Sequence, residues 1–282
     1  MISNSLAADP WMAPSMAAGG VTRANPTSMG AILTAPATLA LTPRYEVAGG
    51  GRVGTSSVLR AEAAATDSTT GPLTLGLMYI REGASFEATT DELPGWLLPG
   101  QDTLNPYTET TVGGGMAMSW LNRHLSAGVG GRFTRYASRF SEQSDNYALN
   151  ASLGGQIEEQ LFLALTGENL YSTDSRDDLK LGSGIRWQPP SKSGASRFGI
   201  EADLVATLAE ETMLSDIHLG MEVRPSPYVP MRAGFHRDAR SGVDSITGGI
   251  GAGSEEALFE YAARVELSVW EHSHSLSLRL FF

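Results

Sequence analysis

Hydrophobic and polar residues alternate along most of the chain from Arg44 onward. Across residues 73–79, for example, the odd positions hold three leucines and a tyrosine, and the even positions hold threonine, glycine and methionine. Successive side chains of a strand point to opposite faces, so this pattern predicts strands with one apolar face. The same segments lack the spacings of three and four that an amphipathic helix requires.

The alternation recurs in about fourteen segments, most of them about 10 to 14 residues long. Typical soluble strands have about five or six residues, whereas a tilted strand that crosses a membrane needs about 9–11. The predicted strands occupy residues 44–54, 57–66, 72–82, 107–121, 124–137, 146–157, 160–171, 178–188, 196–208, 214–224, 228–237, 244–253, 257–269 and 274–282.

These strands need a place to bury their apolar faces, since no helical pattern is available to cover them. A closed barrel in lipid provides one, because its outer face meets hydrocarbon and its closure satisfies every backbone hydrogen bond. The alternative, a soluble β-sandwich, is typical of shorter strands. We therefore predict an all-β fold: a closed antiparallel up-and-down transmembrane β-barrel of about fourteen strands over residues 44–282. Residues 1–43 precede the barrel.

The connections and the C-terminus favour the same topology. Short connections such as Asn122–Arg123 alternate with longer ones, of which residues 82–106 are the longest, as in outer-membrane barrels with short periplasmic turns. The final strand ends on an aromatic residue and resembles the C-terminal signal that the barrel assembly machinery reads. The predicted assembly signal consists of Leu276, Leu278, Leu280 and Phe282.

Composition excludes several other classes of protein. The chain has no cysteine, which excludes disulfide scaffolds and thiolate metal sites. Its net charge of −11 argues against a nucleic-acid-binding protein, which needs a basic face. We expect no cofactor and no metal. His272 and His274 alternate on one strand without a third ligand at a useful spacing, and His274 and Ser275 point to opposite faces, so we expect no catalytic site.

Charged residues of both signs share the parity that points into the predicted lumen. They either fill and rigidify a narrow barrel, or they line a polar conduit or seat an N-terminal hatch. We expect Glu222 and Arg232 to pair across a hairpin. The predicted network contains Arg44, Glu46, Arg52, Arg60, Glu62, Glu201, Asp203, Glu222, Arg232, Glu260 and Arg264, with Glu109, Arg132, Arg186, Arg224, Glu266 and Arg279 on the same face.

Two segments outside the strands are candidates for function. Residues 1–43 lack alternation and carry little charge; they form either a hatch inside the lumen or an unfolded tail. The long loop carries apolar residues, which predict a lid or ligand contact, or a loop that folds into the barrel mouth or dips into lipid. The loop residues are Phe86, Leu93, Trp96, Leu97 and Leu98.

Several motifs, in order along the chain, resemble the outer-membrane long-chain fatty-acid transporter family. They are Asn25-Pro26, residues 35–40 (APATLA) before the first strand, residues 167–170 (GENL), residues 220–224 and 230–235 around one hairpin, and residues 248–251 and 274–278. The resemblance implies a fourteen-stranded barrel with an N-terminal hatch, in which Asn25 and Pro26 belong to the hatch. The chain is shorter than the transporter and has alanine at position 35, where the family has asparagine.

Two functions lead at this point, and an outer-membrane enzyme ranks third behind them. The first is passive passage of a small hydrophobic compound through an outer-membrane barrel. The second is a structural or docking barrel within an envelope complex for secretion or surface motility, which the shorter chain favours. In both, the chain lies in the outer membrane of a Gram-negative bacterium. The expected partners are outer-membrane lipid and lipopolysaccharide, the barrel assembly machinery and other envelope proteins, with no nucleic acid.

Overall fold

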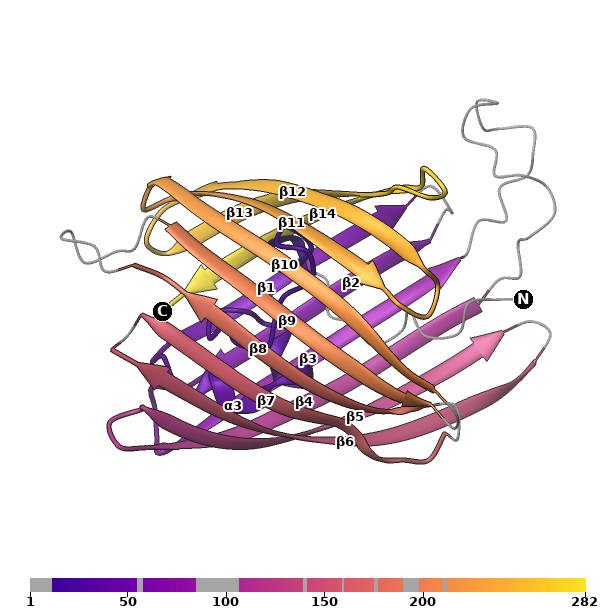
Figure 1. Ribbon diagram of the computed structural model, residues 1–282, viewed down its shortest axis with the longest axis horizontal. Coiled ribbons are helices and arrows are strands. Elements are labelled where there is room, and N and C mark those ends of the chain that lie inside the picture. Colours follow the sequence, from indigo (N-terminus) through magenta and orange to yellow (C-terminus); the bar gives the residue numbers. More distant parts are fainter. Residues whose placement is uncertain are drawn as a thin grey trace.

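The computed structural model describes residues 12–54, 58–84, 107–138, 141–158, 160–174, 177–189, 198–209 and 212–282. In these residues the strands form one closed antiparallel barrel, in which each strand pairs with its neighbours in sequence. Strand β1 (Tyr45–Gly54) closes the barrel by pairing with β14 (His272–Phe281). The predicted fold class, a closed up-and-down barrel of fourteen strands, is confirmed (Figure 1).

Within residues 12–44, three short helices precede the barrel strands: α1 (Ala13–Ala17), α2 (Ala31–Thr34) and α3 (Pro36–Leu39). In the described part of the chain, no helix is long and apolar enough to cross a membrane. The remaining strands are β2 (Leu59–Asp67), β3 (Leu73–Ala84), β4 (Tyr107–Trp120), β5 (Leu125–Ser138), β6 (Ser141–Ile157), β7 (Leu161–Ser172), β8 (Leu179–Trp187), β9 (Phe198–Ala209), β10 (Thr212–Ser226), β11 (Val229–Asp238), β12 (Val243–Gly253) and β13 (Ala257–Glu266).

Each predicted strand corresponds to an observed strand, and most ends agree within a few residues. The largest difference is at the start of β6, which begins at Ser141 rather than at residue 146. Residues 141–145 are polar, so they give no apolar alternation, yet they continue the backbone pairing with β5 up to the Ser138–Ser141 pair. The apolar pattern therefore marks the hydrophobic part of this strand rather than its full length.

The outer face of the barrel is apolar and the inner face is polar. Leu77 is 67% exposed on the outside, whereas its neighbour Met78 is 2% exposed on the inside, and the same alternation runs through β14. A continuous belt of exposed leucine, isoleucine and valine is far larger than a soluble monomer tolerates. It matches the lipid-facing surface of a transmembrane barrel.

The two ends of the barrel differ in their connections. We call the end that carries the C-terminus and the β10–β11 connection the turn end, and the opposite end, where residues 85–106 join β3 to β4, the loop end. Neighbouring turns contact each other at the turn end. Tyr228 donates its hydroxyl to Glu255 at 2.9 Å, and this hydrogen bond raises the pKa of the tyrosine.

Residues 12–41, which we call the inner segment, lie inside the ring of strands (Figure 1). Nearly all of them are buried. Ile32, Leu33 and Leu39 pack with the inward-facing Met78 and Ile80 of β3 in one apolar cluster. The wall thus supplies apolar contacts for the inner segment in one region and charged groups elsewhere.

The pairing between β6 and β7 is interrupted between Leu149 and Ala151. On the β7 side Asn169 adopts a left-handed backbone conformation, with φ of 55°. The Asn169 amide donates to the Asn150 side-chain oxygen at 2.8 Å, and Asn150 donates to the Leu33 carbonyl at 2.5 Å. This bulge therefore connects the wall directly to the inner segment.

Candidate functional site: the lumen and the inner segment

The turn-end half of the lumen contains a chain of alternating charges, which we call the turn-end charge chain. Its members are buried or half-buried and share inward parity: Arg44, Glu46, Arg186, Glu201, Glu222, Arg224, Arg232, Glu260 and Arg279. Strand register creates it, because Glu222 and Arg232 lie directly opposite each other on β10 and β11. Arg232 Nε donates to Glu222 Oε2 at 2.7 Å, so the expected pair is present.

From this pair the chain continues in both directions around the wall. Arg186 Nη2 lies 3.6 Å from Glu222 Oε1, and its Nη1 donates to Glu201 at 3.1 Å. In the other direction Arg232 pairs with Glu260. Arg279 bridges Glu260 and Glu46, and Arg44 reaches Glu46 at 3.1 Å. Opposite charges that alternate in this way offset one another's cost of burial.

A second charge cluster lies toward the loop end, on β1 to β3. Glu82 accepts from Arg52 at 3.2 Å and from Arg60 at 3.4 Å, and Arg60 also pairs with Glu62. Tyr107 donates its hydroxyl to the other Glu82 oxygen at 3.1 Å. Two strands from β1, on β13, Arg264 pairs with Glu266 at 3.0 Å. Strong charges therefore line both halves of the lumen, largely as ion pairs.

Charged groups of the wall also hold the inner segment. Arg23, a buried residue of that segment, donates to Glu168 on β7 and lies 3.5 Å from Asp203 Oδ2 on β9. The backbone amides of Thr22 and Arg23 both donate to the same Asp203 oxygen, at 2.9 and 3.0 Å. A carboxylate that accepts two amide donors and faces a guanidinium fixes the backbone of the segment at this point.

The turn after α1 fits against glycines of β10 and β11. Gly19 has a φ of +73°, and a Cβ added to Gly234 would lie 2.2 Å from the Gly19 amide nitrogen. His218 Nδ1 is 2.9 Å from the Gly19 carbonyl, so this nitrogen carries the proton, because a carbonyl only accepts. The His218 ring stacks on His236 with centroids 4.2 Å apart. Thr247 accepts from the Gly19 amide at 3.0 Å.

The second half of the inner segment lies against β4 to β6. A Cβ added to Gly128 would lie 2.6 Å from the Ala37 amide nitrogen, so only glycine lets the segment approach the strand this closely. The Ala37 amide donates to Ser152 Oγ of β6 at 2.9 Å. Arg123, in the β4–β5 turn, donates to the Ala40 carbonyl at 3.0 Å.

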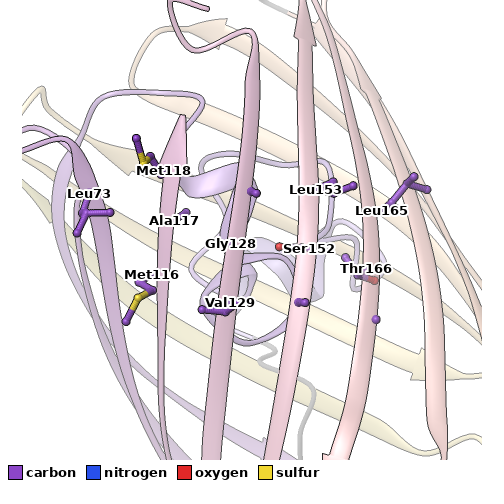
Figure 2. A pocket seen from close by; sticks show the side chains of 13 residues that line it. Leu73, Met116, Ala117, Met118, Gly128, Val129, Ser152, Leu153, Leu165 and Thr166 are labelled. Atoms are coloured by element: carbon purple, nitrogen blue, oxygen red, sulfur yellow. The ribbon is translucent and has the colours of Figure 1, made fainter. Parts of the chain in front are cut away.

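The outer face of the same strands has an apolar groove with a volume of about 550 Å³. Small outward residues, Ala127, Ala151 and Gly167, line it between larger side chains. Figure 2 shows the larger side chains. They are Leu73, Met116, Met118, Val129, Leu153 and Leu165. Gly128 and Ser152 reach the groove from the inner face, so the wall between groove and inner segment is little more than backbone here.

The structure places the predicted residues as follows. The predicted lumen charges all lie on the buried or half-buried side of the wall, and Asn25 and Pro26 lie in the inner segment. Leu276, Leu278 and Leu280 point outward on β14, and Phe282 follows it. The predicted loop residues Phe86, Leu93, Trp96, Leu97 and Leu98 lie outside the described residues.

Sequence reasoning missed several residues that contact the inner segment. Arg23, Glu168, Asn150, Ser152, Thr247 and His218 all hydrogen-bond across this contact. The inward parity of Asn150, Ser152, His218 and Thr247 was a usable signal, because each is a polar residue among alternating apolar ones. Arg23 carried a weaker signal, as a single cation within a nearly uncharged segment.

Comparison with known proteins supports the fold. No protein-family profile matches the chain, and no curated protein sequence does. Among solved structures, the toluene transporter TbuX of Ralstonia pickettii matches 98% of this chain and 99% of its own, with a TM-score of 0.72 and 14% sequence identity. A deletion mutant of the monoaromatic hydrocarbon channel TodX matches 97% and 98%, with a TM-score of 0.59 and 11% identity.

The outer membrane protein Omp33 of Acinetobacter baumannii is a more distant match, with a TM-score of 0.52 and 13% identity over 86% of this chain and all of its own. At these identities the likeness concerns the fold. The fourteen-stranded barrel that the resemblance to the fatty-acid transporter family implied is the barrel observed here. The chain therefore shares the fold of outer-membrane barrels whose members include hydrocarbon channels.

Proposed function

We propose that the chain is an outer-membrane channel for passive passage of a small hydrophobic compound, with its turn end facing the periplasm. One observation carries the proposal: the apolar groove on the outer wall lies opposite the inner segment, across a wall of little more than backbone. A compound that reaches the inner segment at this level has a short apolar route toward the lipid. The fold shared with a toluene transporter and a monoaromatic hydrocarbon channel supports the same class of compound.

Blocking the groove from outside tests this route. Ala151→Phe places a ring in the groove, between Val129 and Gly167 in the register, without touching the lumen charges. Ala63→Phe is the matched control, because Ala63 also points outward but lies on β2, away from the groove. Both variants add the same apolar bulk to the lipid-facing surface.

The measurement is uptake of radiolabelled toluene by Gram-negative cells that carry each variant. We expect the unsubstituted chain to raise uptake above that of cells with an empty vector. Ala151→Phe lowers uptake toward the empty-vector rate, and Ala63→Phe leaves it unchanged. Equal uptake with and without the chain contradicts the channel, whereas equal uptake by the two variants contradicts the route through the groove.

A docking role within an envelope complex is the second candidate. The observation that favours it is that the inner segment and paired charges lie buried inside the ring of strands. Solubilising the barrel in mild detergent and identifying the proteins that co-purify tests this role. If an envelope protein co-purifies in stoichiometric amount and the chain does not raise toluene uptake, docking is favoured over passage.

A further inference from the structure

The loop end of the outer wall carries a row of polar side chains next to the apolar belt. By strand register, Arg81 on β3 lies opposite Thr110 on β4, which in turn lies opposite Arg135 on β5. The next row toward the turn end, two residues along each strand, contains Tyr79, Val112 and Phe133. Rows of aromatic residues mark the membrane–water interface of transmembrane barrels. This polar row therefore lies at the level of the lipid headgroups.

Arg81 differs from the other outward arginines on the described strands. Arg135 Nε donates to Asp145 on the next strand at 2.9 Å. Arg237, on the opposite side of the barrel, has Asp244 as its neighbour at 3.9 Å. No ion pair involves Arg81 within the described part of the chain, and its cross-strand neighbours are Ala61 and Thr110.

An exposed guanidinium at this level suits one kind of ligand. Arginine presents its donors in a planar fork that binds phosphate through two hydrogen bonds, and its long stem lies along apolar surface while the head reaches the headgroup region. The neighbouring Thr110 supplies a hydroxyl donor. Among the described residues, no carboxylate lies opposite Arg81 on β2 or β4, so its charge is available for an anion.

We propose that Arg81, together with Thr110, binds the phosphate of an outer-leaflet lipid. With the loop end facing the cell exterior, the lipid at this level is one whose headgroup is a phosphorylated sugar. The proposal depends on the orientation of the barrel in the membrane and not on passage of any compound. It assigns a specific lipid contact to the β3–β4 face of the wall.

Native mass spectrometry of the purified barrel in detergent tests the contact, with lipid A as the probe. Binding of bisphosphorylated lipid A is compared with binding of phosphate-free lipid A that carries the same acyl chains. We expect the phosphorylated form to bind more tightly. Arg81→Gln reduces the affinity by about tenfold, the loss of roughly one charge-assisted phosphate contact. Arg237→Gln, which removes an outward arginine beside an aspartate, leaves the affinity unchanged.

Several outcomes overturn the proposal. Equal affinities for the two lipids mean that the phosphate is not recognised. If Arg237→Gln reduces the affinity for lipid A as much as Arg81→Gln does, only the overall charge of the barrel matters. Displacement of lipid A by an equal concentration of inorganic phosphate assigns the site to a free anion rather than to a lipid. Heat-dependent mobility on gels confirms that both variants are folded barrels, so a loss of binding reports on the site.

Discussion

At the residue scale, Glu222 is the most heavily shared group in the turn-end charge chain. It accepts from Arg232 at 2.7 Å and from Arg224 at 2.8 Å, and it lies 3.6 Å from Arg186. Without this carboxylate Arg186 would keep only Glu201 and Arg232 only Glu260, and Arg224 has no other ion pair among the described residues. The consequence of its loss is therefore larger than the value of any single ion pair.

Glu222→Ala is expected to destabilise the barrel by about 3–5 kcal/mol, the usual effect of removing one partner from a buried ion pair. The melting temperature in detergent should fall clearly. Asp145→Ala is the control, because it breaks the exposed pair with Arg135, which solvent screens. If both variants melt at the temperature of the unsubstituted chain, the turn-end charge chain contributes little to stability.

Parity explains which residues of the site were predictable. Glu222 and Arg232 could be paired from sequence because both lie on regular strands of one hairpin, where side-chain direction follows residue number. Glu168 was likewise predictable as an inward residue, because the alternation of β7 continues through it, together with regular pairing to β8. The direction of the Arg23 side chain could not be predicted, because a segment without periodicity gives no direction for its side chains.

At the scale of elements, the inner segment and the strands depend on different information. The strands form from a repeated local pattern, so their number and approximate ends followed from the sequence. The inner segment has no such pattern, and its three short helices are held mainly by contacts with the wall. Its path therefore follows from tertiary contacts, such as Ala37 with Ser152 and Arg23 with Asp203, which no local signal encodes.

The glycine contact at β11 gives a test of how the inner segment is held. Gly234→Ala adds a Cβ where the Gly19 amide nitrogen is 2.2 Å away, so the turn after α1 must move off the wall. Gly248→Ala on β12 is the control, because its Cβ would have the Arg232 carbonyl oxygen as its nearest contact, at 3.8 Å. Neither substitution removes a charge.

We expect Gly234→Ala to raise the ion conductance of the barrel in planar bilayers and to expose the inner segment to protease. Gly248→Ala should match the unsubstituted chain in both measurements. If Gly234→Ala also matches it, the segment does not depend on close approach to β11, and its hydrogen bonds to Asp203 and Thr247 are sufficient to hold it.

At the scale of the whole molecule, the barrel reverses the polarity of a soluble protein. Charges lie inside, and the apolar residues form the exposed surface. Closure makes this arrangement possible, because β1 pairs with β14 and leaves no open edge. The last residue also contributes to the closure between β1 and β14. The Phe282 amide donates to the Tyr45 carbonyl at 3.1 Å, and the two rings pack edge to face. Such an apolar outer surface is stable when it contacts the hydrocarbon of a lipid bilayer.

A charge on the lipid face tests that conclusion. Leu77 lies within β3 and is among the most exposed leucines of the belt, so Leu77→Arg places a guanidinium in hydrocarbon. We expect a loss of about 2–4 kcal/mol in unfolding from lipid vesicles, because an arginine near the bilayer midplane costs this much. Val53→Arg, next to the loop end of β1, should cost only about 0–1 kcal/mol, since its side chain reaches the interface. Equal costs at the two positions would mean that the apolar belt does not face a bilayer, because only a membrane makes the cost of an outward arginine depend on its depth.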